Sequence, residues 1–115
     1  MAAARTLIAS IFLLALAAAP ASAEPDRAAE ANAAFATYPK ESLARGEQGV
    51  VRYKVKIDGT GRPSQCEVTE SSGFARLDQA TCSLLMQRAK FTAAKDRRGR
   101  GRRSIYEGKV TWRLS

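Results

Sequence analysis

Residues 49–70 read GVVRYKVKIDGTGRPSQCEVTE, and most of the expected sheet follows from this segment. Apolar side chains at positions 51, 53, 55 and 57 alternate with basic ones at 52, 54 and 56. That period of two is typical of a strand with one buried face and one wet face. Asp58-Gly59-Thr60-Gly61 supplies the glycines that a hairpin turn needs, so the segment from Pro63 to Glu70 is predicted to return as an antiparallel second strand.

The chain after this hairpin predicts one long helix and one further strand. Residues 71–73, Ser-Ser-Gly, break the second strand. Over residues 77–90 the apolar side chains recur at positions 77, 80, 84, 85 and 89, which is a helical period. Residues 104–114 return to strand alternation, with Trp112 on the core face. We therefore expect an α+β fold in which the helix covers one face of a three-stranded antiparallel sheet.

Cys66 and Cys82 are the only two cysteines, and they fall on the second strand and on the long helix. An even number of cysteines in an exported chain indicates a disulfide. The bridge would close a loop of about 17 residues and remove roughly 3 kcal/mol of chain entropy from the unfolded state. Two buried free thiols are the alternative.

The first 23 residues are organised like a secretory signal peptide. Arg5 precedes an apolar run over residues 7–19, and Ala21-Ser22-Ala23 provides a small-residue cleavage site. Cleavage before Glu24 leaves 92 residues with a net charge of +7, enough for one domain. We expect a periplasmic protein. The alternative is an inner-membrane anchor through residues 7–23, which is short for a span of about 20 residues.

The residues between the leader and the hairpin predict a lead-in and a short helix. Residues 24–37 are rich in alanine and show no apolar stripe, so we expect a flexible or weakly helical lead-in before a domain over residues 38–115. Pro39 suits the first turn of a short helix over residues 40–45. Tyr38 either packs on that helix or presents its ring to a partner.

The composition lacks the parts of most catalytic sites. Without histidine, Ser-His and Cys-His nucleophile pairs cannot be assembled. The two cysteines form neither a Cys-x-x-Cys motif nor a zinc-ligand spacing. We therefore expect no enzyme activity, no cofactor and no metal site. An exported basic protein meets lipids and envelope proteins rather than DNA, so we also expect no nucleic-acid partner.

Residues 95–103, KDRRGRGRR, carry six basic residues against one acidic one. A glycine-punctuated charge run of this kind is typical of a mobile, solvated loop. A second hypothesis is that this basic loop docks the protein on an anionic membrane surface or on an acidic periplasmic loop. Its basic residues are Lys95, Arg97, Arg98, Arg100, Arg102 and Arg103.

Several short motifs occur together along the chain. In chain order they are Tyr38-Pro39, Gly49-Val50-Val51, Asp58-Gly59-x-Gly61-Arg62, Ser71-Ser72-Gly73, Leu77-Asp78, Ala89-Lys90-Phe91 and a closing aromatic strand through Trp112. Each motif is common by itself, but their order and spacing are specific, and they cover residues 38–114. Together they resemble the TonB C-terminal domain family, and the resemblance implies a β-β-α-β fold.

The resemblance also implies a binding function. In this family the last strand lies at a sheet edge and accepts a short extended peptide, the TonB box, from an outer-membrane transporter. An edge strand offers unpaired N–H and C=O groups to such a peptide. The expected partner is therefore an envelope protein or a TonB-box-like peptide. The positions that match the family's receptor-contacting segments are Tyr38, Pro39, Tyr106, Gly108, Lys109, Val110, Thr111, Trp112 and Arg113.

The chain differs from a complete energy transducer of this family. It has no histidine, and its four prolines are dispersed rather than gathered in a spacer. We therefore expect a short, free-standing periplasmic member, for which a role in energy transduction and transmembrane transport follows from the resemblance alone. The alternative is a structural or regulatory envelope protein that forms a homodimer through the same edge and has no transporter partner.

Overall fold

The computed structural model describes residues 25–115. The predicted signal peptide and the alternative anchor, which fall within residues 1–23, lie outside the described residues. No helix in residues 25–115 is long and apolar enough to cross a membrane.

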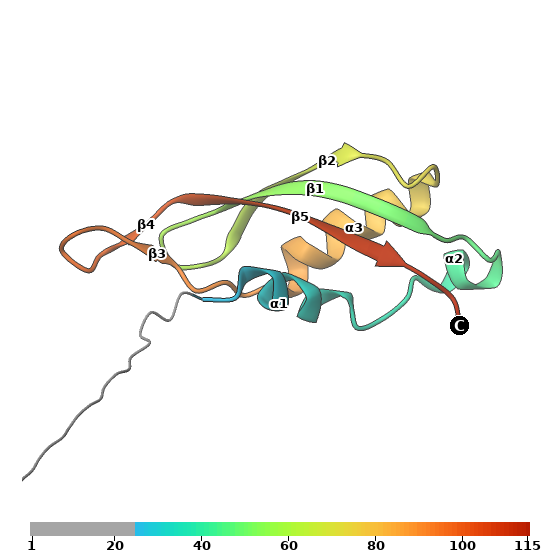
Figure 1. Ribbon diagram of the computed structural model, residues 1–115, viewed down its shortest axis with the longest axis horizontal. Coiled ribbons are helices and arrows are strands. Elements are labelled where there is room, and N and C mark those ends of the chain that lie inside the picture. Colours follow the sequence, from blue (N-terminus) through green and yellow to red (C-terminus); the bar gives the residue numbers. More distant parts are fainter. Residues whose placement is uncertain (1–24) are drawn as a thin grey trace, which may run out of the picture.

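A three-stranded antiparallel sheet forms the centre of the fold, in the strand order β2-β1-β5. Helices α1 and α3 pack against the same face of this sheet (Figure 1), which confirms the predicted α+β class. The elements are α1 (Arg27–Asn32), the 3-10 turn η1 (Ala33–Phe35), α2 (Lys40–Ala44), β1 (Gly49–Ile57), β2 (Pro63–Glu70), α3 (Ala75–Arg88), β3 (Ala94–Lys95), β4 (Gly101–Arg102) and β5 (Ser104–Trp112).

The central strand β1 carries the largest share of the core. Val51, Tyr53, Val55 and Ile57 are each at most 1% exposed, whereas the basic residues between them remain in contact with water. This is the alternation that the sequence predicts, because successive side chains of a strand point to opposite faces. The turn after Ile57 is held by Asp58, whose Oδ1 accepts hydrogen bonds from the main chain of the turn.

Helix α3 presents one narrow apolar stripe to the sheet. Leu77, Thr81 and Leu85 follow one another at a spacing of four residues and are fully buried. The helix begins two residues before the predicted start, and Ala89 leaves it in an extended conformation. The indole Nε1 of Trp112 on β5 donates a 3.0 Å hydrogen bond to Thr81 Oγ1, so a polar contact crosses the interface between helix and sheet.

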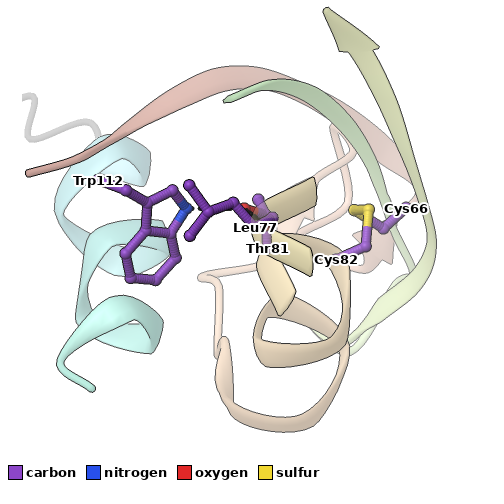
Figure 2. The surroundings of a disulfide bond; sticks show 5 residues. All are labelled: Cys66, Leu77, Thr81, Cys82 and Trp112. Carbon is purple, nitrogen blue, oxygen red and sulfur yellow. Dashed lines mark hydrogen bonds between the residues drawn. A yellow bond between two sulfur atoms is a disulfide. The ribbon is translucent and has the colours of Figure 1, made fainter. Parts of the chain in front are cut away.

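The predicted disulfide joins the other side of α3 to the sheet. Cys66 on β2 and Cys82 on α3 are bonded, with their Cα atoms 5.5 Å apart. Figure 2 shows this bond and Trp112 on opposite sides of the helix. The helix is therefore fastened covalently to β2 and by hydrogen bonding and packing to β5, the two edge strands of the sheet.

The segment before Tyr38 differs from the expected lead-in, because it forms part of the core. Asp26 caps α1 by accepting a hydrogen bond from the Ala29 amide at 3.0 Å. Ala31 and Ala34 are buried, and the ring of Phe35 lies edge-on against Trp112 with centroids 5.6 Å apart. Two alanines and one phenylalanine on one helical face thus form a stripe too small for the sequence pattern to reveal.

The basic loop also differs from expectation, because it is a formed hairpin. Strands β3 and β4 pair antiparallel, and the hairpin extends beyond the end of the main sheet (Figure 1). Asp96 closes its turn: the Asp96 amide donates to the Arg100 carbonyl at 2.8 Å, and Oδ1 accepts from the amides of Arg98 and Arg100. The one acidic residue of this charge run therefore supplies the turn of a hairpin.

Candidate functional site

Strand β5 has a partner on only one side within the described residues. Its nine residues pair with β1 from Gly49↔Trp112 to Ile57↔Ser104 without a break in register. In an antiparallel strand alternate residues direct both N–H and C=O to the same neighbour, so every second residue of β5 directs these groups away from β1. No strand of the described residues pairs with this outer edge of β5.

The side chains of β5 divide into a core row and an exposed row. Val110 and Trp112 are buried, at 8% and 4% exposure, so of these two expected partner contacts only the main chain is accessible. Lys109 and Thr111 point to the opposite face and are exposed. Arg113 follows the end of the strand and is exposed as well.

A groove runs along this edge between β5 and the helical segment α1–η1. Two open hollows of about 440 and 420 Å³ are both lined by Asn32 and Lys109, and so adjoin each other. The first extends to Ala28, Tyr106 and Gly108, and the second ends at Phe35 and Thr111 among others. If another chain lay beside β5 as an added strand, every second side chain of that strand would therefore face α1–η1.

Gly108 lies on the core face of β5, where the side chains of Tyr53 and Tyr106 leave no room for a Cβ atom. It faces Tyr53 across β1 and β5. A Cβ at this position would lie 2.6 Å from the Tyr106 ring and 2.8 Å from the Tyr53 hydroxyl, so glycine is what lets the two tyrosines fit side by side. The Tyr53 hydroxyl is buried without a hydrogen-bond partner among the described residues. Burial, followed by the neighbouring Tyr106, raises the pKa of Tyr53, which keeps its proton.

Tyr38 packs into the domain rather than presenting its ring to solvent. Its hydroxyl donates a hydrogen bond to the carbonyl of Glu47, and its ring lies edge-on to Trp112 with centroids 5.2 Å apart. Burial, followed by the charge of Glu47, raises the pKa of Tyr38. The sequence left open packing on the short helix or presentation of the ring to a partner, whereas the ring packs against β5. Pro39 is half-buried directly before α2.

Sequence reasoning missed the side of the groove that α1–η1 provides. The one local signal is the capping residue Asp26, which marks a helix start, whereas Ala31, Ala34 and Phe35 form too small an apolar stripe to predict that the helix packs on the sheet. The described residues contain no group of three or more histidine, cysteine, aspartate or glutamate side chains placed to hold a metal ion. The groove can thus provide main-chain hydrogen bonds and apolar contacts.

Comparison with known proteins agrees with this architecture. The family described as Gram-negative bacterial TonB protein C-terminal matches residues 35–114. Among solved structures, the solution structure of the TonB C-terminal domain of Helicobacter pylori, residues 179–285, is similar in fold with a TM-score of 0.54. The two chains share 18% identity over 77% of this chain and 78% of the other. No curated protein matches the chain. This family is a non-enzymatic family of protein-interaction domains of the bacterial envelope. Because the match covers most of its length, the chain belongs to the TonB C-terminal domain family.

Proposed function

We propose that this domain binds an extended segment of an envelope protein, such as the TonB-box-like peptide of an outer-membrane transporter, as an added strand along β5. The observation that carries the proposal is the position of β5 at the sheet edge, paired with β1 alone over nine residues. Main-chain hydrogen bonds to this edge supply affinity with little demand on the partner's sequence.

The groove beside β5 adds selectivity to that main-chain pairing. Alternate side chains of an added strand would face α1–η1, where Asn32 offers an amide and Phe35 an aromatic surface. Pocket-lining side chains of this kind select among peptides whose backbones all pair equally well. The domain would therefore prefer small or apolar side chains at every second position of its partner.

A transport role would depend on which envelope protein supplies that segment. By family resemblance, the bound segment belongs to a transporter that receives energy through its TonB box. Within this proposal the domain acts as the periplasmic adapter that holds the segment, and its own chain performs no chemistry.

The mechanism is tested by removing one N–H at a time from the β5 edge. Lys109→Pro and Val110→Pro are made in parallel, because at neighbouring positions one N–H faces β1 and the other faces the open edge. The variant that keeps the wild-type melting temperature should lose calorimetric binding of a transporter's TonB-box peptide. If the folded variant binds this peptide as tightly as the wild type, strand addition at β5 is wrong.

A second arm of the test leaves the protein untouched. Two versions of the peptide, N-methylated at alternate amides in opposite phases, should differ in affinity by at least about tenfold, because only one phase removes hydrogen bonds to β5. Equal affinity of the two versions would contradict the proposal. Size-exclusion chromatography with light scattering, with and without peptide, separates this reading from a homodimer: an edge-paired dimer would dissociate as the peptide binds, and a monomer would not change its state.

A further inference from the structure

The hairpin formed by β3, β4 and their turn concentrates unpaired positive charge. We name residues 94–103 the cationic arm. Its one acidic side chain, Asp96, is engaged by Arg100, whose Nε lies 3.2 Å from Oδ2. The other basic residues of the arm make no ion pair within the described part of the chain, and they are Lys95, Arg97, Arg98, Arg102 and Arg103. Five positive charges are therefore available to a partner.

The arm is held in one place by close backbone contact at its base. Gly101 of β4 lies against Gly59 in the turn between β1 and β2, and a Cβ on Gly101 would come within 1.8 Å of the Gly59 carbonyl oxygen. Only glycine permits this approach. Together with the turn fixed by Asp96, the contact presents the charges as a formed surface. Binding to a partner would therefore not carry the entropy cost of ordering the loop.

An open cleft of about 750 Å³ lies where the arm joins the sheet. Lys56 and Arg103 contribute its positive charge, and Gln65 contributes a side-chain amide. The Ser64 hydroxyl also lines the cleft, but it already donates to the Lys56 carbonyl at 3.2 Å. Asp58 also lines the cleft, but its Oδ1 already accepts hydrogen bonds from the Thr60 and Arg62 amides. The buried hydroxyl of Ser104, another lining residue, has no hydrogen-bond partner among the described residues. This set of donors suits a phosphate group.

The cleft also contains an exposed apolar side chain. Ile105 is 54% exposed at the rim, two residues after Arg103. A surface that sets an apolar residue beside several cations fits the boundary between lipid headgroups and acyl chains. An acidic polypeptide would complement the cations but would leave Ile105 without a matching environment.

We propose that the cationic arm and the cleft at its base form a docking site for the anionic phospholipid surface of a membrane, with a headgroup phosphate bound between Lys56 and Arg103. The site includes the first two residues of β5, Ser104 and Ile105, and lies away from residues 109–112, so docking does not require that a partner strand be present. Membrane docking would restrict the domain's search for envelope partners to two dimensions and hold the β5 edge near the bilayer.

Vesicle co-sedimentation tests this proposal with the protein purified after export. Vesicles of phosphatidylcholine alone are compared with vesicles of phosphatidylcholine and phosphatidylglycerol in equal parts. The wild type should bind only the anionic vesicles. Binding should weaken strongly as the salt concentration rises from about 0.1 M to about 1 M, where the Debye length falls from about 10 Å to about 3 Å.

The test variant is the triple substitution Arg97→Gln, Arg98→Gln and Arg103→Gln. Within residues 25–115, none of these side chains makes an ion pair or a side-chain hydrogen bond, so the fold should be unchanged. Each cation near an anionic surface contributes roughly a factor of five, so affinity should fall by about a hundredfold. The matched control, Lys40→Gln, Arg45→Gln and Arg113→Gln, removes the same charge at the opposite end of β5 and should retain nearly full binding.

Three results would overturn the proposal. The first is an equal loss of binding in both triple variants, which would mean that net charge alone attracts the protein. The second is wild-type binding to neutral vesicles, which a retained apolar leader would explain. The third is binding to soluble polyglutamate as tight as that to anionic vesicles, which would make the partner an acidic polypeptide. In support, short-chain phosphatidylglycerol should shift the amide resonances of Lys56 and Arg103 and leave those of residues 109–112 unchanged.

Discussion

At the scale of single residues, one polar contact in the core joins the last strand to the long helix. Thr81 Oγ1 donates to the Leu77 carbonyl at 2.8 Å and accepts from Trp112 Nε1 at 3.0 Å. Both side chains are buried, so a lost partner could not be replaced by water. Thr81 can therefore be buried in the core, because its hydroxyl donates a hydrogen bond to the backbone of its own helix and accepts one from the indole of Trp112.

A double-mutant cycle measures this contact. Thr81→Val keeps the side chain's shape but leaves the indole N–H unsatisfied, so the free energy of unfolding should fall by about 1–3 kcal/mol. In a Trp112→Phe background the same substitution should have a much smaller effect, which gives a coupling energy of at least about 1 kcal/mol. Urea unfolding followed by far-UV circular dichroism provides the values. Additive effects would contradict the hydrogen bond.

At the scale of elements, the connection between β2 and α3 is organised by one carboxylate. Asp78 in the first turn of α3 accepts hydrogen bonds from the Ser71 hydroxyl, and from the amide and hydroxyl of Ser72 at 2.9 and 2.8 Å. Partial burial would by itself raise the pKa of Asp78, but these hydrogen bonds together outweigh burial and lower it below 3.8. The Ser-Ser-Gly turn is therefore a structural junction that orients the helix.

The lowered pKa predicts an acid-sensitive junction. Above the ordinary pKa of an aspartate, folding favours the charged form of Asp78, and its contribution to stability is fully present. This contribution is lost as the pH falls through the lower pKa of the folded state. Asp78→Asn should therefore reduce stability at neutral pH and reduce the loss of stability between about pH 5 and pH 2.

The measurement is chemical unfolding across that pH range. A double variant with Ser71→Ala and Ser72→Ala keeps the carboxylate and the Ser72 amide donor but removes both hydroxyl donors, so it should show a partly reduced pH dependence. An Asp78→Asn variant with the full acid sensitivity of the wild type would contradict the assignment to this junction. Asp58 and Asp96 also have lowered pKa values, and both contribute in the same direction, so some acid sensitivity should remain.

At the scale of the whole molecule, the first helical segment completes both the core and the groove. Phe35 contacts Tyr53 on β1 and Trp112 on β5, with ring centroids 6.0 and 5.6 Å apart. Glu30 reaches the segment after α3, where its carboxylate accepts hydrogen bonds from the Thr92 amide and hydroxyl. The segment α1–η1 therefore packs beside β5. Through Glu30 it also hydrogen-bonds to Thr92, just before the cationic arm begins.

Substitutions within α1 test whether it belongs to the folded unit. Ala31→Asp places a carboxylate at a fully buried position and should lower the free energy of unfolding by about 3–5 kcal/mol. Ala29→Asp, on the exposed face of the same turn, should change stability by no more than about 0.5 kcal/mol. Thermal and urea unfolding of the two variants gives the comparison. Equal stability of both would mean that α1 is not packed in solution.

The parts predicted correctly from the sequence are those with a local signal. The alternation over residues 51–57, the glycines of the following turn and the helical period after residue 77 identify β1, β2 and α3, because the period of a regular element is set by its own backbone geometry. The disulfide follows from the number of cysteines and their placement on facing elements. The residues of the candidate edge were identified through the family resemblance, which adds strand order to what periodicity supplies.

The tertiary structure alone decided what lies beside the β5 edge and how the cationic arm is held. Alanine is small enough for any environment, so its presence at positions 31 and 34 does not indicate burial, and both are core residues because of the cluster they join in the fold. The arm is ordered by contact between Gly101 and Gly59, forty-two residues apart in sequence. Such contacts are long-range, and a local pattern of residue types does not encode which distant segments meet.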